Sequence, residues 1–364
     1  MEKQMIKEGT KERSSNLELL RIVSMLLIVA HHFVVNSGVT ALYDFHDVSP
    51  NMLFLQLWGM WGKTAINVFI LISGYFMCQS RLTLRRFGKV YLEAKFYVVL
   101  IYFILLIVGY ETKTVDRLLN VLFGFIRNPG NGFTSSFLMF YLFVPFYNML
   151  INGMDKRQHR WLIALLLTYF TIAPMLLRSN HVFFEPLWYA VLYFVAAYIR
   201  LYPAKWTENN TVCGISLIAT VLLSFLSVIT VDFVGVRFGF FDAYYMVSDS
   251  NHLFAFLVGL FAFLFFRNLK MRNSRFVNRV AATTFGVLCI HASSDAMRTL
   301  LWKDVLDVAG HFSLPMPKLI LFSAASAVTV FAVCSLIDML RIRFVEKPVF
   351  RWLTKFDWFN KELY

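Results

Sequence analysis

Charged side chains are scarce in this sequence, and their scarcity decides the class of protein. Only 16% of the 364 residues are Asp, Glu, Lys or Arg, while 58% are hydrophobic. Water-soluble domains average about 25% charged and about 45–50% apolar residues. The chain has too little polar surface to cover a soluble globule, so we expect it to be embedded in a lipid bilayer.

Cysteines are also few, and they lie far apart. Cys78, Cys213, Cys289 and Cys334 form no CxxC pair. Structural zinc sites and disulfide frameworks need cysteines at close, characteristic spacings. We therefore predict no metal site, no disulfide framework and no permanently bound cofactor.

Long apolar runs, by contrast, recur along the whole chain. Backbone amides in hydrocarbon must bond within their own helix, and about 20 residues cross a bilayer. The sequence therefore predicts an all-α, polytopic transmembrane helical bundle of about ten spans. A shorter run, 118–126, is expected to lie at the interface or to re-enter. The ten runs are 17–37, 59–79, 90–110, 133–152, 161–177, 184–202, 211–231, 251–266, 280–299 and 317–340.

The distribution of Lys and Arg predicts the orientation of the bundle. With the N-terminus inside, 24 of the 35 basic residues fall in inside segments and nine in outside segments, as the positive-inside rule requires. This places both ends in the cytoplasm, with tails at 1–16 and 341–364 in a single integral membrane domain, 1–364. Topology thus accounts for the net charge of +13, and we expect no nucleic-acid partner.

The first span contains ionisable residues, which are costly in a bilayer and mark functional sites. Arg21 and His32 are eleven residues apart, about three turns, so they share a helix face with Glu18 and Asn36. A histidine can accept a proton from an attacking hydroxyl, because its unperturbed pKa is about 6.5. The alternative is a histidine that only bonds a neighbouring helix. His31 points about 100° away from this face.

Several segments resemble the acyltransferase 3 family of integral membrane proteins. The Arg, ten residues, His pattern of Arg21 and His32 is similar to that family's first-helix signature. NVFILISGYF, which contains Ser73, resembles its second-helix motif, and RIRFVEKP resembles its closing Glu-x-Pro. SFLMFYLFVPFYNMLI and TTFGVLCIH resemble its middle and ninth helices.

The resemblance implies an enzyme that transfers an acyl group, often acetyl, from cytoplasmic acyl-CoA to a sugar hydroxyl. The acceptor would be a cell-surface or exported glycan, or a lipid-linked glycan, and the location the bacterial cytoplasmic membrane. His32 would be the catalytic histidine and Arg21 its partner, although His31 could compete for the role. His32 could act as a general base or carry the acyl group itself, and the residues leave both possibilities open.

Two further clusters are candidates for function. Arg85, Arg86 and Lys89 follow the second span, where arginines could bind the phosphates of acetyl-CoA. The alternative is ordinary positive-inside charge. In the ninth span, His291 and Asp295 are four residues apart, so on one helix they would share a face and could pair. Alternatively, the outer end of this span emerges into water.

A transporter or flippase for a glycan or lipid-linked precursor is the rival function. Intramembrane His and Arg also suit proton-coupled transport. However, the sequence has no matched pair of Gly- or Pro-broken spans, which is the usual indication of a transporter. The enzyme is therefore the favoured interpretation.

Overall fold

The computed structural model describes residues 14–127, 132–177 and 184–363. The described residues form helices joined by short connections, and no β-strand occurs among them. Residues 1–13 of the expected N-terminal tail lie outside this range. The α-helices are α1 Ser15–Val35, α2 Pro50–Gly59, α3 Gly62–Met77, α4 Leu84–Ile107, α5 Val115–Arg127, α6 Gly132–Gly153, α7 Lys156–Leu167, α8 Ala173–Leu177, α9 Glu185–Leu201, α10 Lys205–Glu208, α11 Asn210–Phe233, α12 Leu253–Asn268, α13 Arg275–Ala281, α14 Thr284–His291, α15 Asp295–Arg298, α16 Met316–Arg341, α17 Lys347–Leu353 and α18 Asp357–Asn360. Short 3-10 turns are η1 Val39–Leu42 and η3 Gly235–Phe238, and π-helical turns are η2 Thr168–Ile172, η4 Thr299–Val305 and η5 Ile342–Glu346.

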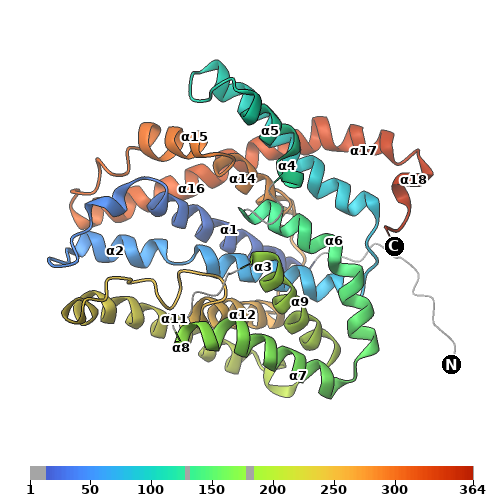
Figure 1. Ribbon diagram of the computed structural model, residues 1–364, viewed down its shortest axis with the longest axis horizontal. Helices are drawn as coiled ribbons and strands as arrows, with labels where there is room; N and C mark the ends of the chain where they lie inside the picture. Colours follow the sequence, from blue (N-terminus) through green and yellow to red (C-terminus); the bar gives the residue numbers. More distant parts are fainter. Residues whose placement is uncertain (1–13, 128–131, 178–183, 364) are drawn as a thin grey trace.

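The long helices run side by side along the longest axis of the molecule (Figure 1). α1 lies in the middle of the bundle and packs against α2, α3, α13 and α16. α5 lies at the upper edge in this view, beside α4. The residues of the first span are therefore surrounded by other helices, which is the position expected for a functional helix in a membrane bundle.

Local sequence signals explain where several helices begin. The Ser49 side chain accepts a hydrogen bond from the Met52 N–H at the start of α2 (3.2 Å), and Pro50 follows it. Asp155 and Gln158 form a reciprocal capping box at the start of α7. Such caps satisfy backbone N–H groups that the first helical turn leaves unpaired.

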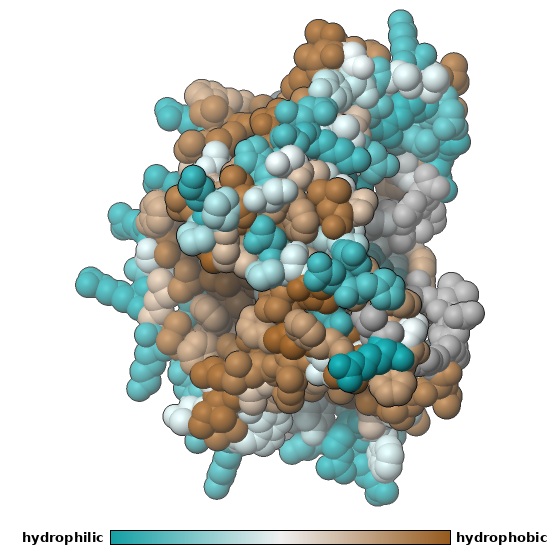
Figure 2. Space-filling model, turned by 90° about the vertical axis from the view of Figure 1, so that its left-hand side faces the viewer, coloured by the Kyte–Doolittle hydropathy of each residue, from teal (hydrophilic) through white to brown (hydrophobic). Residues whose placement is uncertain are grey.

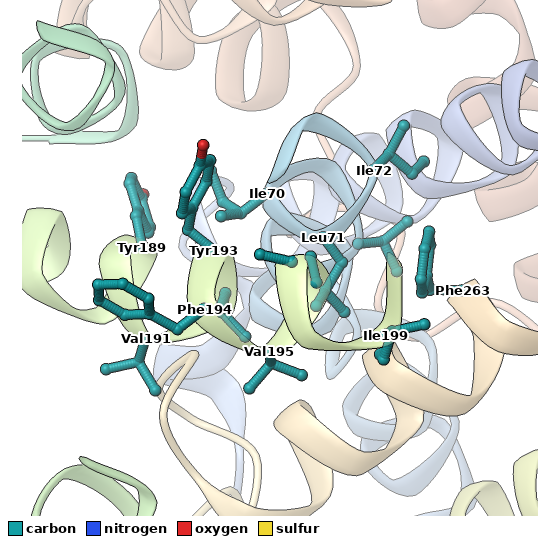
Figure 3. Close-up of a cluster of buried hydrophobic side chains, with 14 of the residues drawn as sticks. Ile70, Leu71, Ile72, Tyr189, Val191, Tyr193, Phe194, Val195, Ile199 and Phe263 are labelled. Atoms are coloured by element: carbon teal, nitrogen blue, oxygen red, sulfur yellow. The ribbon is translucent and has the colours of Figure 1, made fainter. Parts of the chain in front are cut away.

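A well-packed part of the bundle is the contact of α3 with α9 and α12 (Figure 3). Ile70 of α3 lies beside Tyr193 of α9 (Figure 3), and Leu71 of α3 and Phe263 of α12 belong to the same cluster; all four are fully buried. This packing holds α3 rigidly beside α1, which is the helix that carries His32.

The segments predicted to be inside gather at one end of the bundle. Asn16 donates to the Arg267 carbonyl (3.0 Å), and Arg81 pairs with Glu362 (2.7 Å). These contacts join loops that the charge pattern assigned to the same side of the membrane. We call this end the basic end; it comprises residues 79–86, 200–208, 267–279 and 341–363.

The opposite end of the bundle faces the viewer in Figure 2. Polar residues are spread over its middle and upper part, and apolar residues cover much of its lower part. Large apolar side chains such as Ile107 and Leu176 are also strongly exposed on the sides of the bundle. Exposed apolar flanks with polar ends are what a helical bundle in a bilayer requires.

The number of spans differs from the prediction. Among the described residues, six helical segments are long and apolar enough to cross a membrane, whereas the sequence predicts about ten. α3 and α12 have 16 residues and α9 has 17, short of the roughly 20 that span a bilayer without distortion. The predicted run 59–79 begins later than expected, because the chain turns at Met60 and Trp61 between α2 and α3.

The predicted ninth span, 280–299, is not one helix. It is divided among α13, α14 and α15. Ser294 begins α15 by accepting from the Met297 N–H (3.2 Å), and the hydroxyl of Thr283 bonds back to the Val280 carbonyl (2.7 Å). Serine and threonine side chains that bond nearby backbone groups compete with helix continuation, so the apolar run is broken on both sides of α14.

The packing of α3 predicts a difference between two matched substitutions. Ile70→Ala should lower the free energy of unfolding by about 2 kcal/mol, because it opens a cavity in a core that cannot collapse. Ile107→Ala, at a side chain that is 85% exposed rather than 0%, should change it by less than about 0.5 kcal/mol. Thermal unfolding in detergent measures both, and equal shifts would contradict the assignment of this core.

Candidate active site

The predicted stripe of α1 borders two neighbouring cavities. Arg21, Met25 and Ile28 line a cavity of about 240 Å³, which we call the lower cavity. Ile28, His32 and Asn36 line a cavity of about 680 Å³, which we call the His32 cavity. The helical spacing therefore brings Arg21, His32 and Asn36 onto a hollowed face of α1. Glu18 lines neither cavity; it is buried and lies 3.6 Å from Arg21 as an ion pair.

His32 is paired with a second imidazole. Its Nδ1 lies 2.9 Å from Nε2 of His291, at the end of α14. Nδ1 of His291 lies 2.6 Å from the Val287 carbonyl, which can only accept, so this nitrogen carries the proton. In a neutral pair, His291 Nε2 is then an acceptor, and His32 Nδ1 must be the donor.

This order of donors leaves Nε2 of His32 with an unshared electron pair. A neutral imidazole has one N–H and one acceptor nitrogen. The hydrogen-bond partner of one ring nitrogen therefore determines which nitrogen carries the proton and which is the acceptor. His291 is itself completely buried. His32 is thus held in the tautomer in which Nε2 can take a proton.

His31 lines the same cavity but has a different partner. Its Nδ1 lies 2.5 Å from the Gly59 carbonyl, so it too leaves Nε2 as an acceptor. The ring packs directly on Gly62, where a Cβ atom would lie 2.4 Å from the imidazole carbons. Both histidines therefore reach the cavity, and the distinction is that only His32 bonds another imidazole.

The two cavities share a wall. Ile28, Phe133 and Leu288 line both of them, so the residues common to the two spaces are apolar. The lower cavity also has Arg21, Ser73 and Lys89 in its wall, and these residues lie toward the basic end. Ser73 donates its own hydroxyl proton to the Phe69 carbonyl (2.7 Å).

A comparison with protein families decides the relationship of the chain. A family model described as an acyltransferase domain matches residues 14–339, a range that contains every residue lining the two cavities. The chain belongs to the acyltransferase 3 family. No curated protein and no solved structure matches it. The protein is accordingly an acyltransferase with membrane-type helices, and the family resemblance seen in the sequence is confirmed.

The three residues of the expected donor cluster lie in two different surroundings. Lys89 lines the lower cavity and pairs with Glu346 (2.8 Å). Arg85 and Arg86 are exposed at the start of α4, and Arg86 also donates to the Arg81 carbonyl (2.8 Å). Because Arg85 is one helical turn before Lys89, it lies about 6 Å further toward the basic end on the same face.

The expected pairing of Asp295 with His291 is wrong. α14 ends at His291 and α15 begins at Asp295, so the two residues do not share a helix face. The Asp295 side chain is 95% exposed and pairs with Arg298 (2.7 Å). His291 faces inward and contacts His32, a partner 259 positions away that spacing along one helix could not reveal.

An ionic cluster beside the lower cavity was not predicted from the sequence. Buried Arg341 bonds Glu93 (2.9 Å), Asp338 (2.6 Å) and Glu346 (2.9 Å). The Tyr97 hydroxyl donates to Asp338 (2.7 Å). The sequence does contain a signal for this cluster: Asp338 and Arg341 are three residues apart at the end of an apolar run, and a charge in a span needs a partner. The cluster fastens α4 to the end of α16, and through Glu346 it also fixes Lys89.

The ionic cluster predicts that Arg341 is essential for stability. Arg341→Ala would leave neighbouring buried carboxylates without their cation, which typically costs about 3–5 kcal/mol. Arg343→Ala, two residues away on the exposed side, removes the same charge and should cost less than about 0.5 kcal/mol. Thermal unfolding of both variants in detergent is the measurement. Matching melting curves would show that the cluster contributes nothing to the fold.

Proposed function

We propose that this acyltransferase moves an acyl group, in the simplest case acetyl, from acyl-CoA to a sugar hydroxyl of a cell-surface or exported glycan. Acyl-CoA approaches from the basic end, and the glycan reaches the His32 cavity from the opposite end. The observation that carries the proposal is the His32–His291 pair, which holds an unprotonated Nε2 in a cavity that abuts the lower cavity. Family membership supports acyl transfer over the rival transport function.

The chemistry assigns one proton transfer to His32. Nε2 takes the proton from the sugar hydroxyl while the oxygen forms a bond to the thioester carbonyl carbon. The tetrahedral intermediate then collapses, the carbon–sulfur bond breaks, and the imidazolium returns the proton to the departing thiolate. His291 supports the charged imidazolium through the Nδ1 hydrogen bond, in the way that a triad's third member orients its histidine.

The donor is expected to bind in an extended form. The lower cavity, at about 240 Å³, suits the pantetheine arm, and the nucleotide would stay at the basic end near Arg85 and Arg86. Guanidinium groups match phosphate oxygens in bidentate geometry. Arg21 and Lys89 in the lower cavity then lie along the path of the arm toward the shared wall.

The role of His32 predicts a loss of transfer without a loss of donor binding. His32→Ala should reduce acyl transfer by about 10²- to 10⁴-fold, the usual contribution of a general base. Membranes containing each variant are supplied with radiolabelled acetyl-CoA, and label on glycan is counted. His31→Ala, at the neighbouring cavity histidine, is the matched control and should retain more activity.

Equal labelling by the wild type and His32→Ala would remove His32 from the mechanism. If His31→Ala abolished labelling while His32→Ala kept its activity, His31 rather than His32 would be the catalytic histidine. His291→Ala should give a partial loss, because the tautomer of His32 is then no longer fixed. Acyl-CoA binding measured on the same variants shows that each still folds.

The basic cluster predicts an effect on donor affinity. The double variant Arg85→Ala/Arg86→Ala should raise the Kd for acetyl-CoA about tenfold, since a hydrogen bond between charged groups contributes about 1.5–3 kcal/mol. Arg157→Ala/Arg160→Ala removes two exposed charges from α7, in another segment that the sequence predicts to be inside, and should leave the Kd nearly unchanged. An unchanged Kd in the first pair would mean that these arginines only set the orientation in the membrane.

A further inference from the structure

The wall of the His32 cavity contains polar groups that the protein does not satisfy. Asn36, Asn120 and Ser293 line this cavity, and each has a buried side-chain atom without a hydrogen-bond partner among the described residues: Nδ2 of Asn36, Oδ1 of Asn120 and Oγ of Ser293. An unmade hydrogen bond at a buried polar group costs about 1–3 kcal/mol. A ligand in the cavity that bonded all three atoms would remove this cost.

Two of these side chains also border a small side pocket. Asn120 and Ser293, together with Arg117, line a space of about 50 Å³ next to the His32 cavity. The side pocket has less than a tenth of the volume of the His32 cavity, so it suits a substituent such as a hydroxyl or hydroxymethyl group rather than the body of a ligand. Asn120 is fixed in orientation, because its Nδ2 donates to Asp116 (3.2 Å).

The types of these atoms match hydroxyl groups. Nδ2 of Asn36 can only donate, Oδ1 of Asn120 can only accept, and the Ser293 hydroxyl can do both. An anionic oxygen could not serve Asn120, since it has no proton to donate. A sugar hydroxyl both donates and accepts, so neighbouring hydroxyls of one sugar can satisfy all three side chains.

The charges of the cavity favour an uncharged ligand. Arg117 bonds Glu111, Arg298 bonds Asp295 and Lys63 bonds Glu185. The fourth cation, Lys95, donates to the Val121 and Leu122 carbonyls of α5. Each cation in the wall thus already has an acceptor, with which an acidic ligand would have to compete. Nε of Arg298 is a buried donor without a partner among the described residues, and the oxygen of an uncharged hydroxyl can accept from it.

We propose that Asn36, Asn120 and Ser293 form the acceptor subsite and that the acceptor presents an uncharged, hydroxyl-rich sugar residue to His32. The proposal rests on the glycan acyltransferase function proposed above. It gives α5, which the sequence predicts either to lie at the interface or to re-enter, a role in recognising the acceptor through Asn120.

The test uses acceptors of known charge with the full-length protein in membranes. Methyl glycosides of glucose, galactose and mannose are offered with radiolabelled acetyl-CoA, beside methyl glucuronoside as the acidic comparison. At least one uncharged glycoside should be acylated or should compete with labelling of the membrane glycan, and the glucuronoside should do so less well than the glucoside. Preference for the glucuronoside, or no response to any uncharged glycoside, overturns the assignment.

Variants then locate the subsite. Asn120→Ala and Ser293→Ala should each raise the KM for the acceptor about three- to tenfold, which is the loss of one neutral hydrogen bond, with kcat and the KM for acetyl-CoA unchanged. Asn210→Ala is the matched control, because its Oδ1 also lacks a partner among the described residues but belongs to α11 at the basic end. Unchanged acceptor KM in both subsite variants overturns the proposal.

The two proposals fail in different ways. If wild-type membranes label no glycan at all, the glycan acyltransferase function is wrong. If the wild type labels glycan and the subsite variants label it with the same acceptor KM, only the subsite is wrong.

Discussion

The hydrogen bond from His291 to the Val287 carbonyl determines the proton arrangement of the whole candidate site. It forces His291 to accept from His32, and this in turn leaves Nε2 of His32 unprotonated, in a residue that lines the His32 cavity. The accepting carbonyl belongs to the preceding turn of α14, four residues before His291, so this helix alone sets which nitrogen of His291 carries the proton. α14 ends at His291, and Asp295 pairs with Arg298 in α15.

Close approach of helices at glycines keeps that pair in position. At Gly62 of α3 a Cβ would overlap the His31 ring, and at Gly286 of α14 it would lie 2.2 Å from the Asp338 carboxyl carbon. Helices in membranes associate through van der Waals packing, which small residues at the contact make possible. α3 and α14 thus approach α1 and α16 from opposite sides, and both histidines of α1 are held between them.

The part of the site that could be predicted from the sequence is the part that lies on one unbroken helix. Arg21, His32 and Asn36 share a cavity-lining face of α1 because eleven and four residues are near-whole numbers of turns. Partners on other helices follow no such rule. His291 meets His32 because α14 packs against α1, and Glu93 of α4 meets Arg341 at the C-terminal end of α16. The prediction for Asp295 was wrong for the same reason: pairing with His291 required one continuous helix, and Ser294 interrupts that helix.

The apolar wall between the two cavities has a consequence for the proposed chemistry. Ile28, Phe133 and Leu288 separate a space lined by Arg21 and Lys89 from a space lined by His32. An acyl group can pass such side chains at little cost, whereas a phosphate would lose its hydration there without gaining a partner. The wall would therefore admit the reactive end of the donor, retain its charged end on the basic side, and limit water reaching the thioester. Because Lys89 is tied to Arg341 through Glu346, the ionic cluster fixes Lys89 and would thereby position the arm of the proposed donor where it meets this wall.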